Sequence, residues 1–196
     1  MSAQLHLAAL QALTIAVNKI VQALGALPLS TANGGTGTTT TFTLGSIVFA
    51  TPDGVYAQDN SNLFWDATNH RLGLRTTSPT VTLDVNGSAA LRQGALTLSN
   101  GANSDITLPT PGTWVRVTGP TGSFSVSGFA GPTNGRVLVL FNSTAQDMTI
   151  TNDATSTAAN RILTLTGSDV ALTGTSLATF VYSTPDLRWI LQSTQG

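Results

Sequence analysis

Apolar and polar residues alternate over the first 28 positions with the period of a coiled-coil helix. Apolar side chains recur at alternating spacings of three and four residues, and no glycine precedes Gly25. This heptad repeat places positions a and d against partner helices. Pro28 ends the predicted helix because it lacks an N–H donor and clashes with the preceding turn. The residues at positions a and d are Leu10, Leu13, Val17, Ile20, Leu24 and Leu27.

The positions beside this seam are also apolar, which favours three helices over two. Positions e and g, which usually carry charges in a two-stranded coil, hold Ala9, Ala16, Val21 and Ala23. The β-branched side chain of Ile20 at position d also disfavours a dimer. We therefore expect residues 1–28 to form a trimeric coiled coil. Leu7 and Ile15 lie outside the seam and would be available for docking into a larger assembly.

Two other interpretations of this segment fit less well. A signal peptide begins with positive charge, whereas the start of this chain is uncharged and its apolar helix exceeds the usual length. A membrane span needs about 20 predominantly apolar residues. The segment is interrupted too often by polar residues, namely Gln11, Thr14, Asn18, Lys19 and Gln22. We therefore expect no membrane insertion.

The pattern changes after Pro28 to a linker rich in glycine and threonine and then to short strands. Residues 29–45 read LSTANGGTGTTTTFTLG and lack the Lys and the following helix of a phosphate-binding loop. A hairpin is predicted from Leu63–Trp65 and Arg71–Leu74, joined by a turn rich in Asp and Asn. In the next strand, Val81, Leu83 and Val85 alternate with polar residues. Because such arms are marginal alone, residues 46–99 are expected to form a shaft intertwined with neighbouring chains.

Residues 100–196 show a serial pattern of short strands and turns. The strand candidates are 113–118, 123–129, 136–142, 147–152, 161–166, 176–183 and 187–192. No helical pattern separates them, which favours a β-sandwich or jelly-roll-like tip domain. The apolar positions expected to form its core include Val137, Val139, Phe141, Leu163, Leu165, Phe180, Tyr182, Trp189 and Leu191. The predicted fold class is therefore mainly β, with an N-terminal coiled coil, a β shaft and a β tip.

Composition excludes several classes of function. Charged residues make up only 9% of the 196 residues, and the net charge is -1. Nucleic-acid binding needs clustered Lys and Arg, and Lys19 is the only lysine. The absence of cysteine excludes disulfides and thiolate chemistry. We expect no nucleic-acid partner and no cofactor.

Candidate catalytic residues are few. Asp66 and His70 flank one turn, but no serine in a suitable context accompanies them, so a turn histidine is the better interpretation. His6 falls at heptad position d, where a trimer would bring three imidazoles to one axis as possible metal ligands. A second ligand layer is missing from the sequence. We therefore predict no catalytic residue, no bound metal and no enzymatic activity.

The aromatic residues of the tip allow a second interpretation. Trp114, Phe129, Tyr182 and Trp189 have rings that can stack on a sugar or fill a core. The loops 143–146 and 153–160 would be the natural recognition surface, because strands hold loops in place without dictating their sequence.

The segment LFWDATNHRLGLRTTSPTVTLDVNGSAAL resembles a recurrent element of bacteriophage tail fibres and related trimeric adhesins. That element has a Leu-Phe-Phe/Trp-Asp hairpin, a Gly-x-Gly-Thr-x-x-Pro segment and a Leu-x-Val-x-Gly strand. TANGGTG, residues 31–37, is also similar to a fibre segment, and the resemblance covers residues 29–91. Arg75 departs from it, because the family usually has the second glycine there. The matching residues are Leu63, Phe64, Trp65, Asp66, Arg71, Leu72, Gly73, Thr76, Ser78, Pro79, Leu83, Val85 and Gly87.

This resemblance implies a structural, trimer-forming role in a virion. The expected protein is a short homotrimeric fibre or spike on the exterior of the tail or capsid, held to other virion proteins by its N-terminal helix. Its tip would attach to the host surface, with a host glycan as a possible partner. Two alternatives stay open: a head fibre that decorates or cements the capsid, and a glycan-degrading tailspike. Such spikes usually carry a long parallel β-helix, for which this chain is short.

Overall fold

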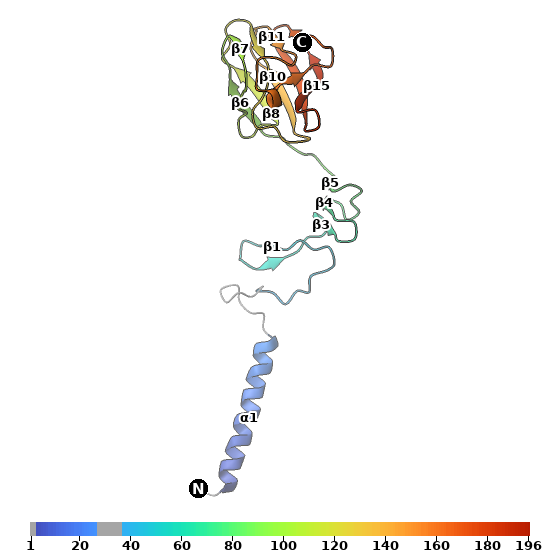
Figure 1. The fold of residues 1–196 in the computed structure, drawn as a ribbon. Coiled ribbons are helices and arrows are strands. Elements are labelled where there is room, and N and C mark those ends of the chain that lie inside the picture. Colours follow the sequence, from blue (N-terminus) through green and yellow to red (C-terminus); the bar gives the residue numbers. More distant parts are fainter. Residues whose placement is uncertain (1–2, 27–36) are drawn as a thin grey trace. The chain divides into compact units, whose positions relative to one another are not determined.

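The computed structural model describes residues 3–26 and 37–196. Over these residues the protein is mainly β, with an α-helix near its N-terminus (Figure 1). The chain divides into two compact units, Met1–Ala89 and Ala90–Gly196. The second unit therefore begins about ten residues before the tip predicted at residue 100, because a strand in residues 90–99 pairs within it.

Helix α1 spans Ala3–Ala26, which confirms the helix predicted in residues 1–28. Thr14 Oγ1 donates a local hydrogen bond of 3.0 Å to the carbonyl oxygen of Leu10 within this helix. Leu27, Pro28 and residues 29–36 of the predicted linker lie outside the described residues. Whether α1 pairs with copies of itself stays a prediction.

The rest of the first unit consists of short strands. They are β1 (Phe49–Ala50), β2 (Tyr56–Ala57), β3 (Leu63–Asp66), β4 (Arg71–Leu74) and β5 (Leu83–Val85). Strands β3 and β4 form the predicted antiparallel hairpin, and β5 adds to β4 in parallel. The side chains of Val81 and Leu83 are more than half exposed, so this sheet has little core of its own.

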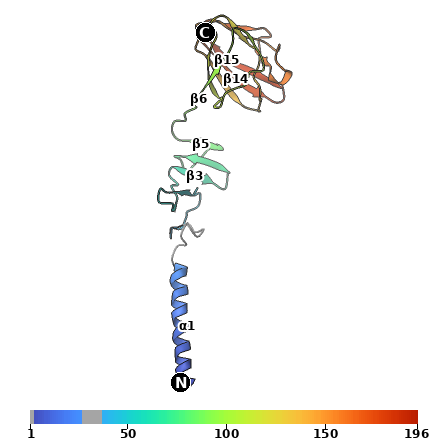
Figure 2. The same cartoon turned by 90° about the vertical axis from the view of Figure 1, so that its left-hand side faces the viewer.

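The second unit is built from stacked, β-solenoid-like sheets (Figure 2). The chain alternates between two sheets as it advances, and successive strands of each sheet pair in parallel. Positions in register lie 21 to 25 residues apart, as in Gln93 with Trp114 and Trp114 with Val139. The six strands of this region are β6 (Gln93–Thr97), β7 (Gly101–Asn103), β8 (Trp114–Thr118), β9 (Phe124–Val126), β10 (Val137–Asn142) and β11 (Met148–Ile150).

The remaining strands complete both sheets. They are β12 (Ile162–Leu163), β13 (Val170–Leu172), β14 (Ser176–Ser183) and β15 (Arg188–Gln195), and a 3-10 turn, η2 (Ala158–Asn160), precedes β12. β13 pairs antiparallel with β11, and β14 pairs antiparallel with β10. The result is a six-stranded sheet, β12-β15-β14-β10-β8-β6, and a four-stranded sheet, β13-β11-β9-β7.

One hydrophobic core fills the second unit. Its centre is aromatic: Phe129 packs edge-on against Phe180 and Trp189, with ring centroids 5.2 and 5.5 Å apart. Trp189 Nε1 donates a 2.9 Å hydrogen bond to the carbonyl oxygen of Phe129, so the indole is buried without leaving its donor unpaired. Strands of both sheets contribute the other core residues, which include Val115, Val117, Val126, Leu138, Leu140, Met148, Ile150 and Ile162.

One expectation about this unit is not confirmed, and another was wrong. A β-sandwich or jelly-roll-like tip is not confirmed, because jelly rolls use antiparallel strands, whereas β6, β8 and β10 pair in parallel. The predicted core side of β10 was also wrong. Leu138 and Leu140 are buried, whereas Val137, Val139 and Phe141 lie on the outer side. Because the odd-numbered and the even-numbered residues of β10 are both apolar up to Phe141, the alternation could not show which set faces the core.

Other core assignments had mixed outcomes. Phe180, Tyr182, Trp189 and Leu191 are buried, as predicted. Leu165 is exposed, and it adopts a left-handed backbone at φ 62° in the loop after β12. The prediction missed strands β6, β7 and β13. β6 contains glycine and alanine, and β7 and β13 have only three residues each.

Candidate functional site

The predicted trimerisation residues of α1 are exposed. The exposed fractions of Leu10, Leu13, Val17 and Ile20 are 64, 62, 48 and 57%. Leu24 lies within α1, and Leu27 lies outside the described residues. Leu7, Ile15 and Val21, which are outside the seam, are also more than half exposed. In the described part of the chain, therefore, nothing covers the apolar side chains from Leu7 to Val21.

Helix α1 is also unsuited to crossing a bilayer as a single span. Among the described helices, none is both long enough and apolar enough for a membrane span.

The turn that carries Asp66 and His70 is a structural turn. Asp66 Oδ1 accepts hydrogen bonds from the backbone N–H groups of Thr68 and Asn69, at 3.0 and 3.1 Å. Its Oδ2 accepts from Asn69 Nδ2 at 2.8 Å. The side-chain amide of Asn69, with these backbone donors, holds the pKa of Asp66 below its ordinary value. The carboxylate is thus committed to closing the β3–β4 hairpin.

His70 is a turn residue, as predicted. Its φ of 55° lies in the left-handed region, and its ring centroid lies 6.3 Å from that of Trp65. Asp66 accepts its hydrogen bonds from Thr68 and Asn69 and not from the imidazole. The pair is therefore not arranged as a carboxylate–imidazole catalytic dyad in the described structure.

Arg75 stands where the resembling fibre element has glycine, and it keeps a glycine-like backbone. Its φ is 58°, in the left-handed region that glycine enters without steric cost. Its N–H donates to the carbonyl oxygen of Asn62 at 2.9 Å, and its own carbonyl accepts from Asn86 Nδ2 at 3.1 Å. These bonds hold the strained residue between β4 and β5.

In the second unit, the loop 143–146 is fixed by a buried asparagine. Asn142 Nδ2 donates to the carbonyl oxygens of Gln146 and Gly174, at 2.9 and 2.8 Å. Its Oδ1 accepts from Thr144 N and Thr144 Oγ1. Since Asn142 is fully buried and its amide is saturated, this loop has a defined conformation. The loop lies at the end of the six-stranded sheet remote from Gln93, where the first strand of the unit begins.

The loop 153–160 is fixed by Asp105. Its carboxylate accepts from Asn160 Nδ2 at 2.7 Å and from Thr157 N at 2.9 Å. The hydrogen bond from Asn160 is the main cause that lowers the pKa of Asp105. Arg188 Nε also binds Asp153 Oδ1 at 2.6 Å. The two predicted recognition loops are thus both held by side chains.

The aromatic residues of the second unit separate into two groups. Phe129, Tyr182 and Trp189 are buried and belong to the core. Trp114 lies on the outer side of β8 and stacks against Phe141 of β10, with ring centroids 6.3 Å apart and planes 17° apart. Sequence reasoning grouped Trp114 with the other aromatic residues and assigned Phe141 to the core. The alternation Trp114-Val115-Arg116-Val117 was the signal that could have separated them.

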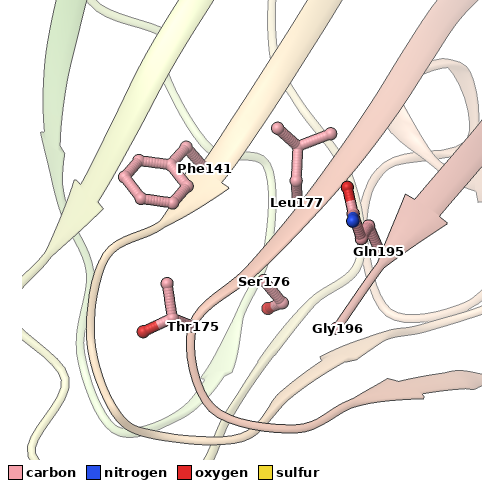
Figure 3. Close-up of a pocket in the computed structure, with 6 residues that line it drawn as sticks. All are labelled: Phe141, Thr175, Ser176, Leu177, Gln195 and Gly196. Atoms are coloured by element: carbon pink, nitrogen blue, oxygen red, sulfur yellow. The ribbon is translucent and has the colours of Figure 1, made fainter.

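A shallow groove of about 280 Å³ lies at the remote end of the six-stranded sheet (Figure 3). It is lined by Phe141, Thr175, Ser176, Leu177, Gln195 and Gly196. Figure 3 shows Phe141 and Leu177 on neighbouring strands, with Thr175 and Ser176 below them. The groove combines two apolar walls with hydroxyl and amide groups, which is a chemistry that suits a neutral polar ligand better than a charged one.

Within the described residues, no three His, Cys, Asp or Glu side chains gather as a metal site. The structure therefore offers exposed apolar surfaces and fixed loops as its candidate functional features. The sequence matches no protein-family profile, and a comparison with curated proteins finds no match.

Proposed function

We propose that this chain is the subunit of a short homotrimeric virion fibre or spike that attaches to a host surface. Its α1 helices form a three-stranded coiled coil and anchor the fibre on the tail or capsid. The second unit serves as the tip. The resemblance of residues 29–91 to trimeric phage fibres supports this assignment of role.

The exposed seam of α1 is the observation that carries the proposal. A single helix of 24 residues gains most of its stability in water from packing of its apolar face. In the described structure this face has no covering partner, and its heptad pattern suits copies of itself. Three copies would bury the seam residues, while Leu7, Ile15 and Val21 would contribute to packing at the flanks or to docking on the particle.

The remote end of the second unit supports attachment as the role of the tip. There the groove and the loop 143–146 lie together, since Asn142 pairs with Ser176 across β10 and β14. Three tips in one fibre would multiply weak contacts with a repeated surface glycan through avidity. Binding would then not need a deep pocket.

Trimerisation through α1 is tested by the solution mass of the full chain. Light scattering should give three times the 20.2 kDa chain mass. Replacing Leu13 and Ile20 together by Asp should give the monomer, because charges at position d face one another across the axis. Replacing Gln11 and Asn18 by Asp, at outer position b, is the matched control and should keep the trimer.

A monomeric unmodified chain would contradict the proposal. A trimer that survives the Leu13 and Ile20 substitutions would place trimerisation in the β regions instead. The attachment role needs a separate measurement, namely binding of the full chain to immobilised bacterial envelope glycans. Trimers that bind no such glycan, yet bind purified capsids, would favour capsid decoration.

A further inference from the structure

The outer side of the six-stranded sheet carries an apolar surface that nothing in the described chain covers. We call it the apolar face; its members are Trp114, Val137, Val139, Phe141, Leu177 and Val181. They come from three neighbouring strands, β8, β10 and β14. Val137 is 42% exposed, and the other five are half-buried.

Strand register makes this surface continuous. Val139 lies beside Trp114 on one side and Thr179 on the other, and Val137 lies beside Val181. Val181 in turn lies beside Ile190 of β15. Cross-strand neighbours on one face contact one another, so these side chains form one patch.

The sequence of β10 is typical of a strand covered on both sides. Residues 137–141 read VLVLF, with no polar position. A strand with one solvated face normally alternates apolar and polar residues, whereas a continuous apolar run marks a strand buried on both faces. The core covers only the inner side, so a second surface is needed for the outer side.

The chemistry of the apolar face favours a protein over a glycan. Arg116 lies beside Phe141 at the β8 edge of the face, and polar residues such as Gln93 and Ser193 lie on the flanking strands. An apolar centre with aromatic residues, bordered by Arg and polar groups, is the composition of protein interfaces. A sugar needs several hydrogen-bonding groups beside its stacking ring, whereas Trp114 and Phe141 have one polar cross-strand neighbour each, Gln93 and Arg116, and have Val139 and Leu177 on their other sides.

Another copy of this chain is the occupant that the proposed trimer makes available. Residues 27–89 tie each second unit to α1, so three copies joined by one coiled coil would meet at an effective concentration above that of a dilute partner. At that concentration an apolar face is covered by its copies before a dilute partner reaches it. The opposite sheet has a contrasting outer row of small side chains, Ala102, Ser125, Thr149 and Ala171, which are in register with one another.

We infer that the apolar face is a second trimer interface, at which the six-stranded sheets of three copies face the threefold axis. The four-stranded sheets then face outward. This inference rests on the proposed homotrimer and adds the orientation of the tip within it. Trp114 and Phe141 become interface residues, so the groove beside Phe141 opens toward a neighbouring copy, and the loop 143–146 is the part of the remote end left for a surface glycan.

The test measures distances between spin labels in the full chain by pulsed electron paramagnetic resonance. The chain has no cysteine, so each variant carries one label per copy. Thr179→Cys places the label on the apolar face, and Thr149→Cys places it on the outer side of the opposite sheet. Both threonines are half-buried, so they form a matched pair. Because packed sheets lie about 10 Å apart, the Thr179 labels should be closer together by more than about 10 Å.

A second pair of variants controls for the case in which the label at Thr179 disturbs the packing. Ala95→Cys and Ala102→Cys replace exposed alanines on the same two sides, and the Ala95 labels should again be closer. Light scattering on the same samples separates the two proposals. Trimers with equal or reversed distances overturn the interface and leave the fibre subunit standing. Monomers overturn both.

Discussion

Helix α1 and the second unit differ in how far each buries its own apolar side chains. The second unit encloses its own core, in which Trp189, Phe129 and Phe180 are fully buried. In α1 the seam residues Leu10 and Leu13 are more than half exposed. The comparison teaches that one region covers its apolar side chains within a single chain, whereas the other leaves them exposed there.

The largest expected effect lies in the core of the second unit. Trp189→Ala should lower the free energy of unfolding by about 3 to 5 kcal/mol, because it leaves a cavity and frees the Phe129 carbonyl from its hydrogen bond. Urea unfolding followed by circular dichroism measures this loss. Trp65→Ala is the control, since that ring is 38% exposed and its loss should cost about 1 kcal/mol. Equal losses would contradict the assignment of Trp189 to a self-contained core.

Dilution should separate the two regions directly. The helical signal at 222 nm should fall on dilution, because α1 without partners loses the packing that stabilises it. In a variant with Trp65→Phe and Trp114→Phe, the near-ultraviolet signal of Trp189 should stay constant, because its contacts lie within one chain. A helical signal that is independent of concentration in a monomeric chain would show that α1 needs no partner.

Acid should weaken the second unit through Asp105. Its folded pKa lies below the ordinary 3.8, mainly because Asn160 donates to the carboxylate. The folded state therefore binds the proton less readily than the unfolded state. The contribution is complete above the unfolded pKa and is lost as pH falls through the folded one. Melting temperatures measured from pH 7 to 2 should decline less steeply in Asp105→Asn than in the parent, with Asp53→Asn as the exposed control.

The smallest expected effect concerns Arg75 in the first unit. Arg75 has a left-handed backbone, which costs a residue with a side chain about 1 to 2 kcal/mol. Glycine avoids this cost, but its greater freedom in the unfolded state offsets part of the gain. Arg75→Gly should therefore stabilise the β3–β4–β5 sheet by about 0.5 kcal/mol, and Arg75→Val should destabilise it. Thermal unfolding of both variants tests this. Stabilisation by Val would show that the backbone is not left-handed in solution.

Local sequence patterns were sufficient to predict several elements. The spacing of α1, the hairpin around Asp66 and the strand Ser176–Ser183 all follow from short-range signals, and the structure contains each. Asp66 and Asn69 made the turn predictable, because the Asp66 carboxylate accepts hydrogen bonds from the backbone N–H and the side-chain amide of Asn69. These features depend on residues within a few positions of one another.

The candidate site was predicted less completely. The heptad repeat predicts the seam of α1. The apolar face could not be predicted, because Val139 and Leu140 are both apolar and an alternation with period two does not show which of them points outward. Only the pairing of β10 with β8 and β14 shows which of them points outward. The groove beside Phe141 also needs Gln195, which strand pairing brings opposite Leu177.

The sequence by itself thus determined a mainly β chain, an apolar N-terminal helix with a heptad seam, and the hairpin turn. The tertiary structure decided the parallel, solenoid-like stacking of β6, β8 and β10, and the side of each strand that faces the core. The physical reason is the distance along the chain between the residues that determine each feature. Helix period and turn chemistry are set by neighbours in the chain, whereas register joins residues more than 20 positions apart, such as Gln93 and Trp114.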